Sequence, residues 1–174
     1  MKRIFLLTLC GYAFSTAFAQ TGTKRITAFG DKFSISVPAD VDTMSAEYMK
    51  YKYHKTPDGK SYFFCDKNAE FSIVIAPMQD GTKEEDLIKH KEEFFNSFTA
   101  KGYKLEESDV KKINGHSVVV VSFYSDVPGG KIFNRRFFAV AGNKLVQVTY
   151  NSFGDDMEKR KLQIEQSINS VIIK

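Results

Sequence analysis

The sequence of 174 residues lacks tryptophan and has only two cysteines and four prolines. One of the cysteines, Cys10, lies in an apolar N-terminal segment that we expect to be removed, so Cys65 would be the only thiol of the mature chain and an internal disulfide is excluded. A single thiol in an oxidising compartment is more often a small buried apolar group than a reactive one, with pairing between chains as the alternative. No Pro- or Ser-rich linker and no internal repeat is visible, which favours a single domain.

A strong excess of one charge is also lacking. The chain has 25 Lys and Arg against 21 Asp and Glu, a formal net charge of +4. Removal of Lys2 and Arg3 with the N-terminal segment would leave 23 basic and 21 acidic side chains, a net charge of +2. Such a small excess gives little attraction to DNA, RNA or anionic lipid, so we expect no nucleic-acid partner.

Long hydrophobic runs are limited to the N-terminus. The basic pair Lys2-Arg3 is followed by an apolar run from Ile4 to Phe14 and then by Ala17-Phe18-Ala19, with small residues where a signal peptidase reads. An apolar run of 11 residues is shorter than the roughly 20 needed to span a bilayer. Because Leu9 stands where a lipoprotein signal has a small residue, Cys10 is not expected to be lipidated. We predict cleavage after Ala19, a single domain at 20–174, no membrane span in it, and a periplasmic or extracellular location.

The remaining chain alternates apolar and polar residues over short stretches that end at turn residues. This period of two predicts strands at 33–37, 48–54, 61–65, 71–76, 118–124, 132–141 and 145–150. Turns are predicted at 56–60, Asn114-Gly115, Pro128-Gly130 and Gly142-Asn143. Val118 to Val121 is apolar on both faces, so this strand should be central and covered on both sides.

Two segments have helical spacing instead. Thr82-Lys-Glu-Glu85 is typical of a capping box, and Leu87, Ile88, Phe94, Phe95 and Phe98 follow at helical intervals until Gly102. A closing helix begins at Asp155, with Met157, Ile164, Ile168 and Val171 on its inner stripe. The fold class is therefore α+β, an antiparallel sheet layered with two main helices.

The order of these elements resembles a known family. The matching segments are Phe33–Pro38, Phe71–Pro77, Val110–His116, Leu145–Tyr150 and Ser167–Ile172. Together they resemble the PsbP-like superfamily, which includes the extrinsic photosystem II subunit, bacterial periplasmic DcrB-like proteins and a yeast Ran-binding import factor. The resemblance implies an α/β/α sandwich around an antiparallel sheet of about six strands, used to bind partners and not to catalyse. Many members have a tryptophan shortly after the first proline, whereas Pro38-Ala-Asp-Val-Asp42 has none, so no functional residue is carried over.

Phe-Asn-Arg-Arg-Phe-Phe at 133–138 interleaves basic and aromatic residues, as a nucleic-acid-binding sheet does. Neighbours in a strand point to opposite faces, so Arg135 and Arg136 cannot form one patch. The simpler interpretation is that each arginine stem packs on aromatic rings with its head paired or solvated. The alternative is a half-open face on which one of them, Arg136 in particular, meets an anionic partner.

Metal binding and catalysis have weaker support. Asp86, His90 and Glu93 follow at i, i+4 and i+7, which we place on the helix face opposite the phenylalanines; they span two turns, about 10 Å, too far to converge on one ion. Cys65, His54 and His116 lie in no nucleophile motif, and no Gly-rich phosphate loop is present. We therefore predict no metal, no cofactor and no enzyme; catalysis would require Cys65 within hydrogen-bond reach of a histidine.

The segment from Tyr48 to Phe64 offers the main surface candidate. If 48–54 is a strand, then Tyr48, Lys50, Lys52 and His54 line one side of it, next to Tyr62 and Phe64 on a hairpin partner. Tyrosine beside cations is common at recognition surfaces. The simpler interpretation is an edge strand whose lysines prevent pairing with another chain, and both roles are compatible.

These observations lead to two functional hypotheses. The first is an exported, non-enzymatic interaction module that binds a protein of the cell envelope, with Tyr48, Lys50, Lys52, His54 and Arg136 as contacts. The second is a carrier of a small apolar or anionic ligand held between the Phe-rich helix and the sheet. Unfilled volume near Phe94, Phe95 and Phe98 would favour the carrier, and a tightly packed core would favour the interaction module.

Overall fold

The computed structural model describes residues 22–54 and 59–174. A seven-stranded sheet contains, in spatial order, β3 (Asp42–Thr43), β4 (Tyr62–Cys65), β5 (Phe71–Asp80), β9 (Lys144–Ser152), β8 (Gly130–Ala141), β7 (His116–Val127) and β6 (Leu105–Ile113). A three-stranded sheet contains β1 (Thr23–Ala28), β2 (Phe33–Pro38) and β10 (Ile172–Ile173). The helices are α1 (Ala46–Tyr53), α2 (Glu84–Lys89), α3 (Lys91–Thr99) and α4 (Met157–Asn169). The predicted signal segment, with Ala19, and residues 56–58 of the predicted turn lie outside the described residues.

All pairs in the large sheet are antiparallel, and its long strands are joined by tight turns. Asn114 and Gly115 have φ angles of 48° and 88°, and Gly142 and Asn143 have φ angles of 54° and 57°. Two successive positive φ angles match the right-handed twist of the flanking strands, which is why Asn and Gly stand there. The three predicted turns between the long strands are confirmed.

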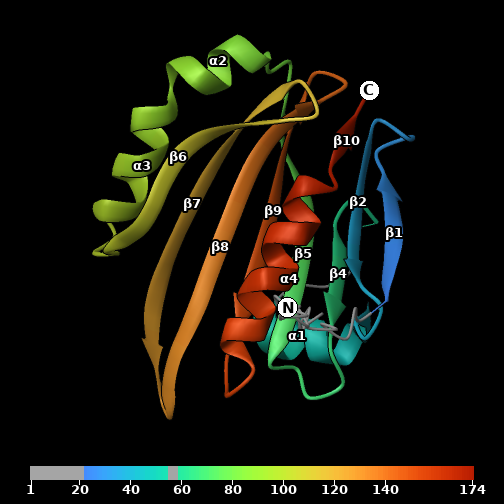
Figure 1. Ribbon diagram of the computed structural model, residues 1–174, viewed down its shortest axis with the longest axis vertical. Helices are drawn as coiled ribbons and strands as arrows, with labels where there is room; N and C mark the ends of the chain where they lie inside the picture. Colours follow the sequence, from blue (N-terminus) through green and yellow to red (C-terminus); the bar gives the residue numbers. More distant parts are fainter. Residues whose placement is uncertain (1–21, 55–58) are drawn as a thin grey trace, which may run out of the picture.

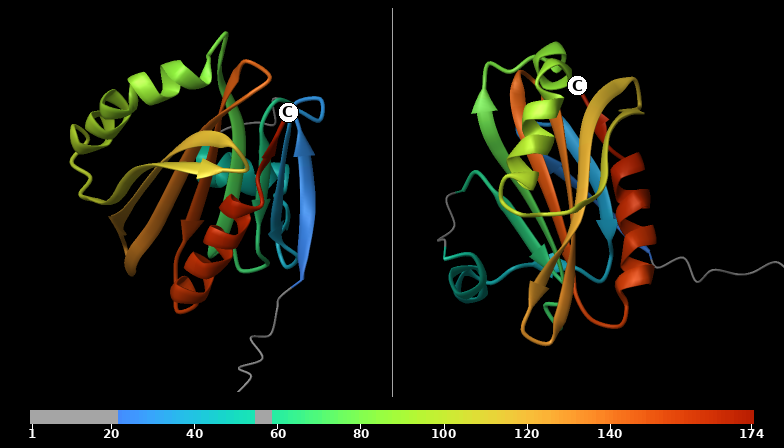
Figure 2. Two further views of the ribbon diagram at one scale, coloured as in Figure 1. Left: turned by 45° about the horizontal axis from the view of Figure 1, so that its top comes forward. Right: turned by 90° about the vertical axis from the view of Figure 1, so that its left-hand side faces the viewer.

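The elements form three layers (Figures 1 and 2). One face of the large sheet is covered by α4 together with the three-stranded sheet; we call it the sealed face. The opposite face is covered by α1 at one end and by α2 and α3 at the other; we call it the open face. The predicted α+β sandwich is confirmed, with a central sheet of seven strands.

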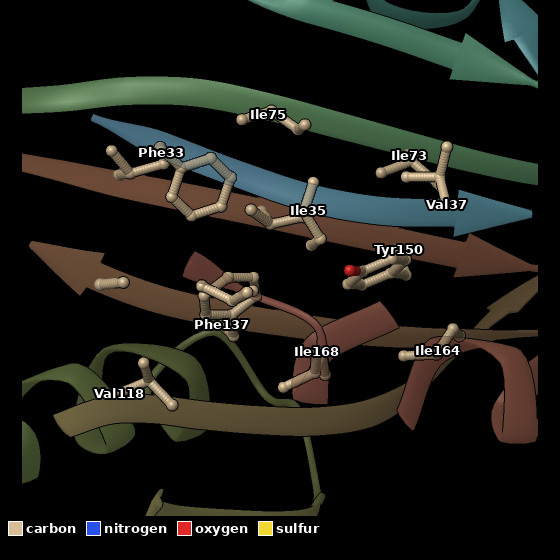
Figure 3. Packing of buried hydrophobic residues seen from close by; sticks show 14 of the residues in the cluster. Phe33, Ile35, Val37, Ile73, Ile75, Val118, Phe137, Tyr150, Ile164 and Ile168 are labelled. Carbon is tan, nitrogen blue, oxygen red and sulfur yellow. The ribbon is translucent and has the colours of Figure 1, made fainter. Parts of the chain in front are cut away.

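The main core fills the space between the sealed face and its cover (Figure 3). Ile73, Ile75 and Tyr150 of the large sheet pack against Ile35 of β2 and Ile164 of α4, and all five are fully buried. The predicted inner stripe of the closing helix is confirmed, since Ile164 and Ile168 are inaccessible to solvent. This core fixes the large sheet on which the open face is built.

A second cluster anchors α2 and α3 on the open face. Leu87 and Phe98 pack over Val119, Val121 and other apolar side chains of β7 and β8. Since Val118 and Val120 point into the main core, the valine-rich strand is covered on both sides, as predicted. It lies next to the edge strand β6 and not at the centre of the sheet.

The strand predicted at 48–54 is wrong, because α1 occupies this segment. Ser45 caps the helix, with its Oγ accepting a hydrogen bond from the Tyr48 backbone N–H at 3.1 Å. Met49 and Tyr53, four residues apart, face the sheet, whereas Tyr51 is 78% exposed. A strand would place all three on one side. Apolar and polar residues alternate along this segment, but the buried positions recur with the period of a helix.

The long helix predicted from Thr82 is also partly wrong. It is divided at His90 into α2 and α3, and its cap lies one residue later than predicted. Asp86 accepts a hydrogen bond from the Lys83 backbone N–H at 3.3 Å, while Thr82 Oγ1 is buried without a partner. No range was predicted for β1, β3, β6 or β10. Of these strands, β3 and β10 are only two residues long and are defined by their partners. No helix in the described part of the chain is long and apolar enough to cross a membrane.

Candidate partner-binding site

Arg135 and Arg136 lie on opposite faces of β8, as strand geometry predicts. Arg135 points to the sealed face, where its guanidinium is 2.7 Å from a Glu107 carboxylate oxygen and 2.6 Å from one of Glu165 on α4. Lys111 completes the cluster with a contact of 2.8 Å to Glu107. The simpler interpretation from the sequence, in which the arginine head is paired, is therefore correct for Arg135.

Arg136 has a different environment on the open face. Its guanidinium carbon lies 5.2 Å from the ring centre of Phe98 and 5.7 Å from that of Phe123. Among the described residues no carboxylate lies within 4 Å of it. Its buried Nε has no hydrogen-bond partner, which is also true of Arg135 Nε. Burial lowers the pKa of Arg136, because the charged form loses hydration that no anion replaces.

Lys52 of α1 is a second cation on the open face. Its Nζ donates a hydrogen bond to Ser72 Oγ at 3.2 Å and lies 5.7 Å and 5.8 Å from the ring centres of Tyr48 and Tyr53. Burial lowers the pKa of Lys52, against the opposing influence of Cys65 and Asp66. Within the described ranges no carboxylate is within 4 Å of Lys52 either. Aromatic rings hold the ammonium group, but its charge is not neutralised.

A strip of polar side chains connects the two cations across the open face. It consists of Ser72 on β5, Thr149 and Asn151 on β9, and Asn134 on β8; we call it the polar strip. Ser72 pairs with Asn151 and Asn151 with Asn134, while Arg136 pairs with Thr149, so all lie on one face. Strand spacing and rise place the Cα atoms of Ser72 and Arg136 about 12 Å apart.

The polar strip is held in place by its own hydrogen bonds. Asn151 Nδ2 donates to Ser72 Oγ at 3.3 Å, and Tyr53 Oη lies 3.1 Å from the same oxygen. Asn134 Nδ2 donates to Ser125 Oγ at 2.9 Å. Ser72, Asn134 and Thr149 are at most 9% exposed, so Asn151 is the residue of the polar strip that a ligand can contact directly.

The five residues predicted from sequence as partner contacts are only partly brought together. Tyr48 and Lys52 are four residues apart on α1 and lie next to the polar strip. Lys50 is exposed on another side of the helix, and His54 ends the helix with a left-handed φ of 53° and an exposed side chain.

The hairpin proposed between 48–54 and 61–65 does not form. Tyr62 and Phe64 of β4 pair with β5, and Phe64 is buried in the main core. Ser72 and Asn151 were not predicted as site residues. The available signal was the polar side chain at every second residue of β9, namely Gln147, Thr149 and Asn151.

The possible catalytic and metal-binding residues have other partners. Cys65 is half-buried, burial raises the pKa of its thiol, and in the described part of the chain it has no hydrogen bond to a histidine. His90 Nδ1 lies 3.0 Å from a Glu93 oxygen. Asp86, His90 and Glu93 line one pocket with Phe94, so the prediction that they lie opposite the phenylalanines is wrong. Residues 22–54 and 59–174 contain no group of three His, Cys, Asp or Glu able to hold a metal ion.

Comparison with known proteins shows the fold. No family model matches the sequence, and no curated protein matches it. Cyanobacterial PsbP from Synechocystis is similar in structure, with a TM-score of 0.61 at 12% identity, over 88% of this chain and 94% of the other. The LpqN protein of Mycobacterium tuberculosis, described as involved in cell envelope biogenesis, has a TM-score of 0.54 at 9% identity, over 87% and 91% of the two chains.

A protein of Bacteroides thetaiotaomicron is similar over 88% of this chain, with a TM-score of 0.58 at 13% identity. This chain spans only 49% of that protein's length. The fold is PsbP-like, as the sequence resemblance implied. At these identities the similarity extends to the fold alone.

Proposed function

We propose that the protein is an exported, non-enzymatic module of the cell envelope that binds an acidic segment of a partner protein on its open face. One observation carries the proposal. Lys52 and Arg136 are both partly desolvated on this face, and among the described residues neither has a carboxylate within 4 Å. The cations buried on the opposite face, Arg135 and Arg160, have two carboxylates each.

Desolvated cations without an anion reduce folding stability, because lost hydration is not replaced. A partner carboxylate would restore the missing Coulomb attraction when it binds. Such complementarity contributes mainly to association rate and specificity. The net charge of +2 expected for the mature chain is too small for steering by the whole molecule, so recognition would depend on these two positions.

Location in the envelope is supported by the N-terminal segment and by one structural neighbour. The predicted cleavage after Ala19 would export the chain, and LpqN has been linked to cell envelope biogenesis in its own organism. A non-enzymatic role is supported by Cys65, His90 and His116, which form no constellation of acid, base and nucleophile with the residues that the structure describes.

Photocrosslinking in intact cells tests the proposal. A photoreactive phenylalanine analogue replaces Tyr51 on α1, which is 78% exposed, and in a matched control replaces Leu162 on α4, which is 61% exposed. We expect a defined protein adduct from position 51 and none from position 162. The adduct should fall at least tenfold when Lys52→Gln and Arg136→Gln are combined, since a close charge pair in an interface contributes over 1.4 kcal/mol.

Lys50→Gln provides the charge control, because Lys50 lies on the same helix but points into solvent. Its adduct yield should equal that of the parent. An adduct at position 51 that survives the double substitution would overturn the proposed recognition surface. An intact mass of the protein from the envelope fraction establishes in the same preparation whether the chain begins at Gln20.

A carrier function is the second candidate, and one pocket favours it. A hollow of about 410 Å³ opens where α2 and α3 meet β5 and β9, lined in part by Leu87, Phe94 and Leu145. Asp86 and Glu93 at the same pocket oppose an anionic ligand and favour an apolar or cationic one. Native mass spectrometry of the protein from its own cells tests this candidate: a bound small molecule, lost in Leu145→Phe, would support it, and a bare chain would oppose it.

A further inference from the structure

A small pocket lies on the open face directly beside Lys52. It has a volume of about 240 Å³ and is formed by α1, the turn between β4 and β5, the hairpin of β7 and β8, and the end of β9. Its lining residues are Tyr48, Lys52, Ala69, Glu70, Val127, Pro128, Ile132, Asn151 and Phe153. The pocket therefore adjoins the polar strip at Asn151.

The walls of this pocket are mainly apolar. Val127, Ile132 and Phe153 are half-buried, so their side chains border the hollow without filling it. Gly130 has a φ of 152° and allows close approach of the hairpin, since a Cβ there would lie 3.3 Å from the Phe153 ring. A side chain at this position would displace the wall that Phe153 provides.

The pocket is lined by one cation, Lys52, and one anion, Glu70. Glu70 is exposed at the rim and forms no ion pair with Lys52 in the described structure. Asp66, which influences Lys52 from nearby, is 2.9 Å from Arg160 and is already neutralised by it. An apolar hollow with one uncompensated ammonium group fits an occupant with both an apolar group and a carboxylate.

The size of the pocket decides which kind of occupant fits. Pockets for drug-sized ligands and cofactors have volumes of about 300–1,000 Å³, and this one is smaller. Interfaces between proteins, by contrast, commonly bury one large aromatic or aliphatic side chain in a well-packed pocket at their centre. The volume therefore favours a single anchoring side chain over a lipid or a cofactor.

We propose that this pocket receives a large apolar side chain of the partner, whose neighbouring Asp or Glu binds Lys52. The inference rests on the proposed function and names the chemistry of the segment that would bind. From this anchor the segment passes Asn151 and lies over the otherwise buried polar strip, and a second carboxylate reaches Arg136. Apolar burial supplies affinity, and the two carboxylates set direction and register.

Three capped dipeptides test the pocket on the full mature protein. They are acetyl-Phe-Glu-amide, acetyl-Phe-Gln-amide, which lacks the carboxylate, and acetyl-Ala-Glu-amide, which lacks the anchor. Binding is measured by titration of backbone amide NMR signals at Asn151 and Ile132. We expect millimolar binding of the first probe and at least tenfold weaker binding of each of the others. Equal affinities for the Phe-Glu and Ala-Glu probes, or no response at either amide, would overturn the inference.

Two variants assign the effects to residues. Ile132→Phe fills the pocket and should abolish the advantage of Phe over Ala, while Ile132→Val should keep it. Lys52→Gln should abolish the advantage of Glu over Gln and leave that of Phe over Ala. A parent-like spectrum outside the pocket shows that each variant is folded.

The same variants separate this inference from the proposed function. If the crosslinked partner is lost in Lys52→Gln and Arg136→Gln but fully retained in Ile132→Phe, the binding face is correct and the anchor pocket is wrong. If the crosslink is insensitive to the loss of both cations, the proposed function itself fails.

Discussion

The two faces of the large sheet differ in how they compensate buried positive charge. On the sealed face, Arg135 has Glu107 and Glu165, and Arg160 has Asp40 and Asp66. On the open face, Lys52 and Arg136 rest against aromatic rings, and the described residues provide no anion for either. Adjacent residues of one strand, Arg135 and Arg136, show both environments.

This difference separates charges that hold the fold together from charges that are available to a ligand. An arginine that forms ion pairs beneath a helix ties that helix to the sheet, and its removal would leave carboxylates without a partner. An unpaired cation on a half-covered face contributes little to the fold, and its charge remains available. Stability should therefore depend on the first group and binding on the second.

Arg160→Met should have the largest effect on stability, a loss of about 3 kcal/mol in the free energy of unfolding, because Asp66 would remain buried without its cation. Arg160 lies 2.9 Å from Asp66, which is only 9% exposed, and its guanidinium carbon is 4.6 Å from the Phe71 ring centre. Urea unfolding measures the loss. Adding Asp66→Asn should recover part of it, and a double variant that is less stable than Arg160→Met would contradict the explanation.

The neighbouring pair gives the most direct comparison of the two faces. Arg135→Met should cost about 2 kcal/mol, less than Arg160→Met because Glu165 is 40% exposed and can be hydrated. Arg136→Met should change stability by less than about 1 kcal/mol, since it removes an uncompensated charge and keeps apolar contact with Phe98. Thermal and urea unfolding of both variants measure this contrast. Equal losses would mean that Arg136 has a structural role.

Glu84 shows that the open face also contains a compensated charge, at the start of α2. Burial opposes its ionised form, but hydrogen bonds from Ser117, His116 and Lys112 outweigh burial and lower the pKa of Glu84 from 4.5 to about 2. Glu84→Gln should cost about 1–2 kcal/mol at neutral pH, as expected for hydrogen bonds to a charged group. Urea unfolding measures the cost.

The pH dependence follows from the lowered pKa of Glu84. The unfolded chain binds the proton more tightly than the folded one, so the contribution of Glu84 is fully present above pH 4.5 and is lost as the pH falls toward 2. The gap between parent and Glu84→Gln stabilities should therefore narrow between pH 5 and pH 2. A gap that is constant over this range would contradict the assignment.

Ser45→Ala should also have a small effect, a loss of about 1 kcal/mol, because one hydrogen bond at the start of α1 disappears. Because α1 carries Lys52, loosening of this helix should lower the yield of the crosslinked adduct, even though the free energy of unfolding changes little. Hydrogen exchange of the α1 amides, compared with that of α4, measures the local loosening. Faster exchange in both helices would indicate a global effect and not the loss of a cap.

Much of the fold could be predicted because its signals are local. Alternating apolar residues mark Phe33–Val37 and Phe71–Ala76, and Asn114-Gly115 and Gly142-Asn143 have the dihedral preferences that their turns require. The segment Tyr48–His54 failed because its alternation fits a strand, whereas Ser45 and the buried positions Met49 and Tyr53 select a helix. Short β3 and β10 depend on distant partners and leave no pattern of their own.

The candidate site was predictable in part for the same reason. The alternation of side chains along a strand predicted that Arg135 and Arg136 lie on opposite faces. Only the position of α4 shows that Arg135 is the one next to carboxylates. Lys52 was predicted as a partner contact on the assumption that 48–54 is a strand. The segment is the helix α1, and this helix places Lys52 next to the polar strip. Ser72 and Asn151 belong to strands far apart in the sequence, so their contact could not be read from either strand alone.

The three-stranded sheet joins the two ends of the described chain, since β2 pairs with both β1 and β10. Ser36 and Ser170, 134 residues apart, are linked there by a hydrogen bond of 2.7 Å. The main core therefore cannot close until α4 and β10 have been synthesised, and contacts of such long range form slowly. In the export that we propose, this arrangement would postpone folding until Ile172 and Ile173 of β10 have crossed the membrane.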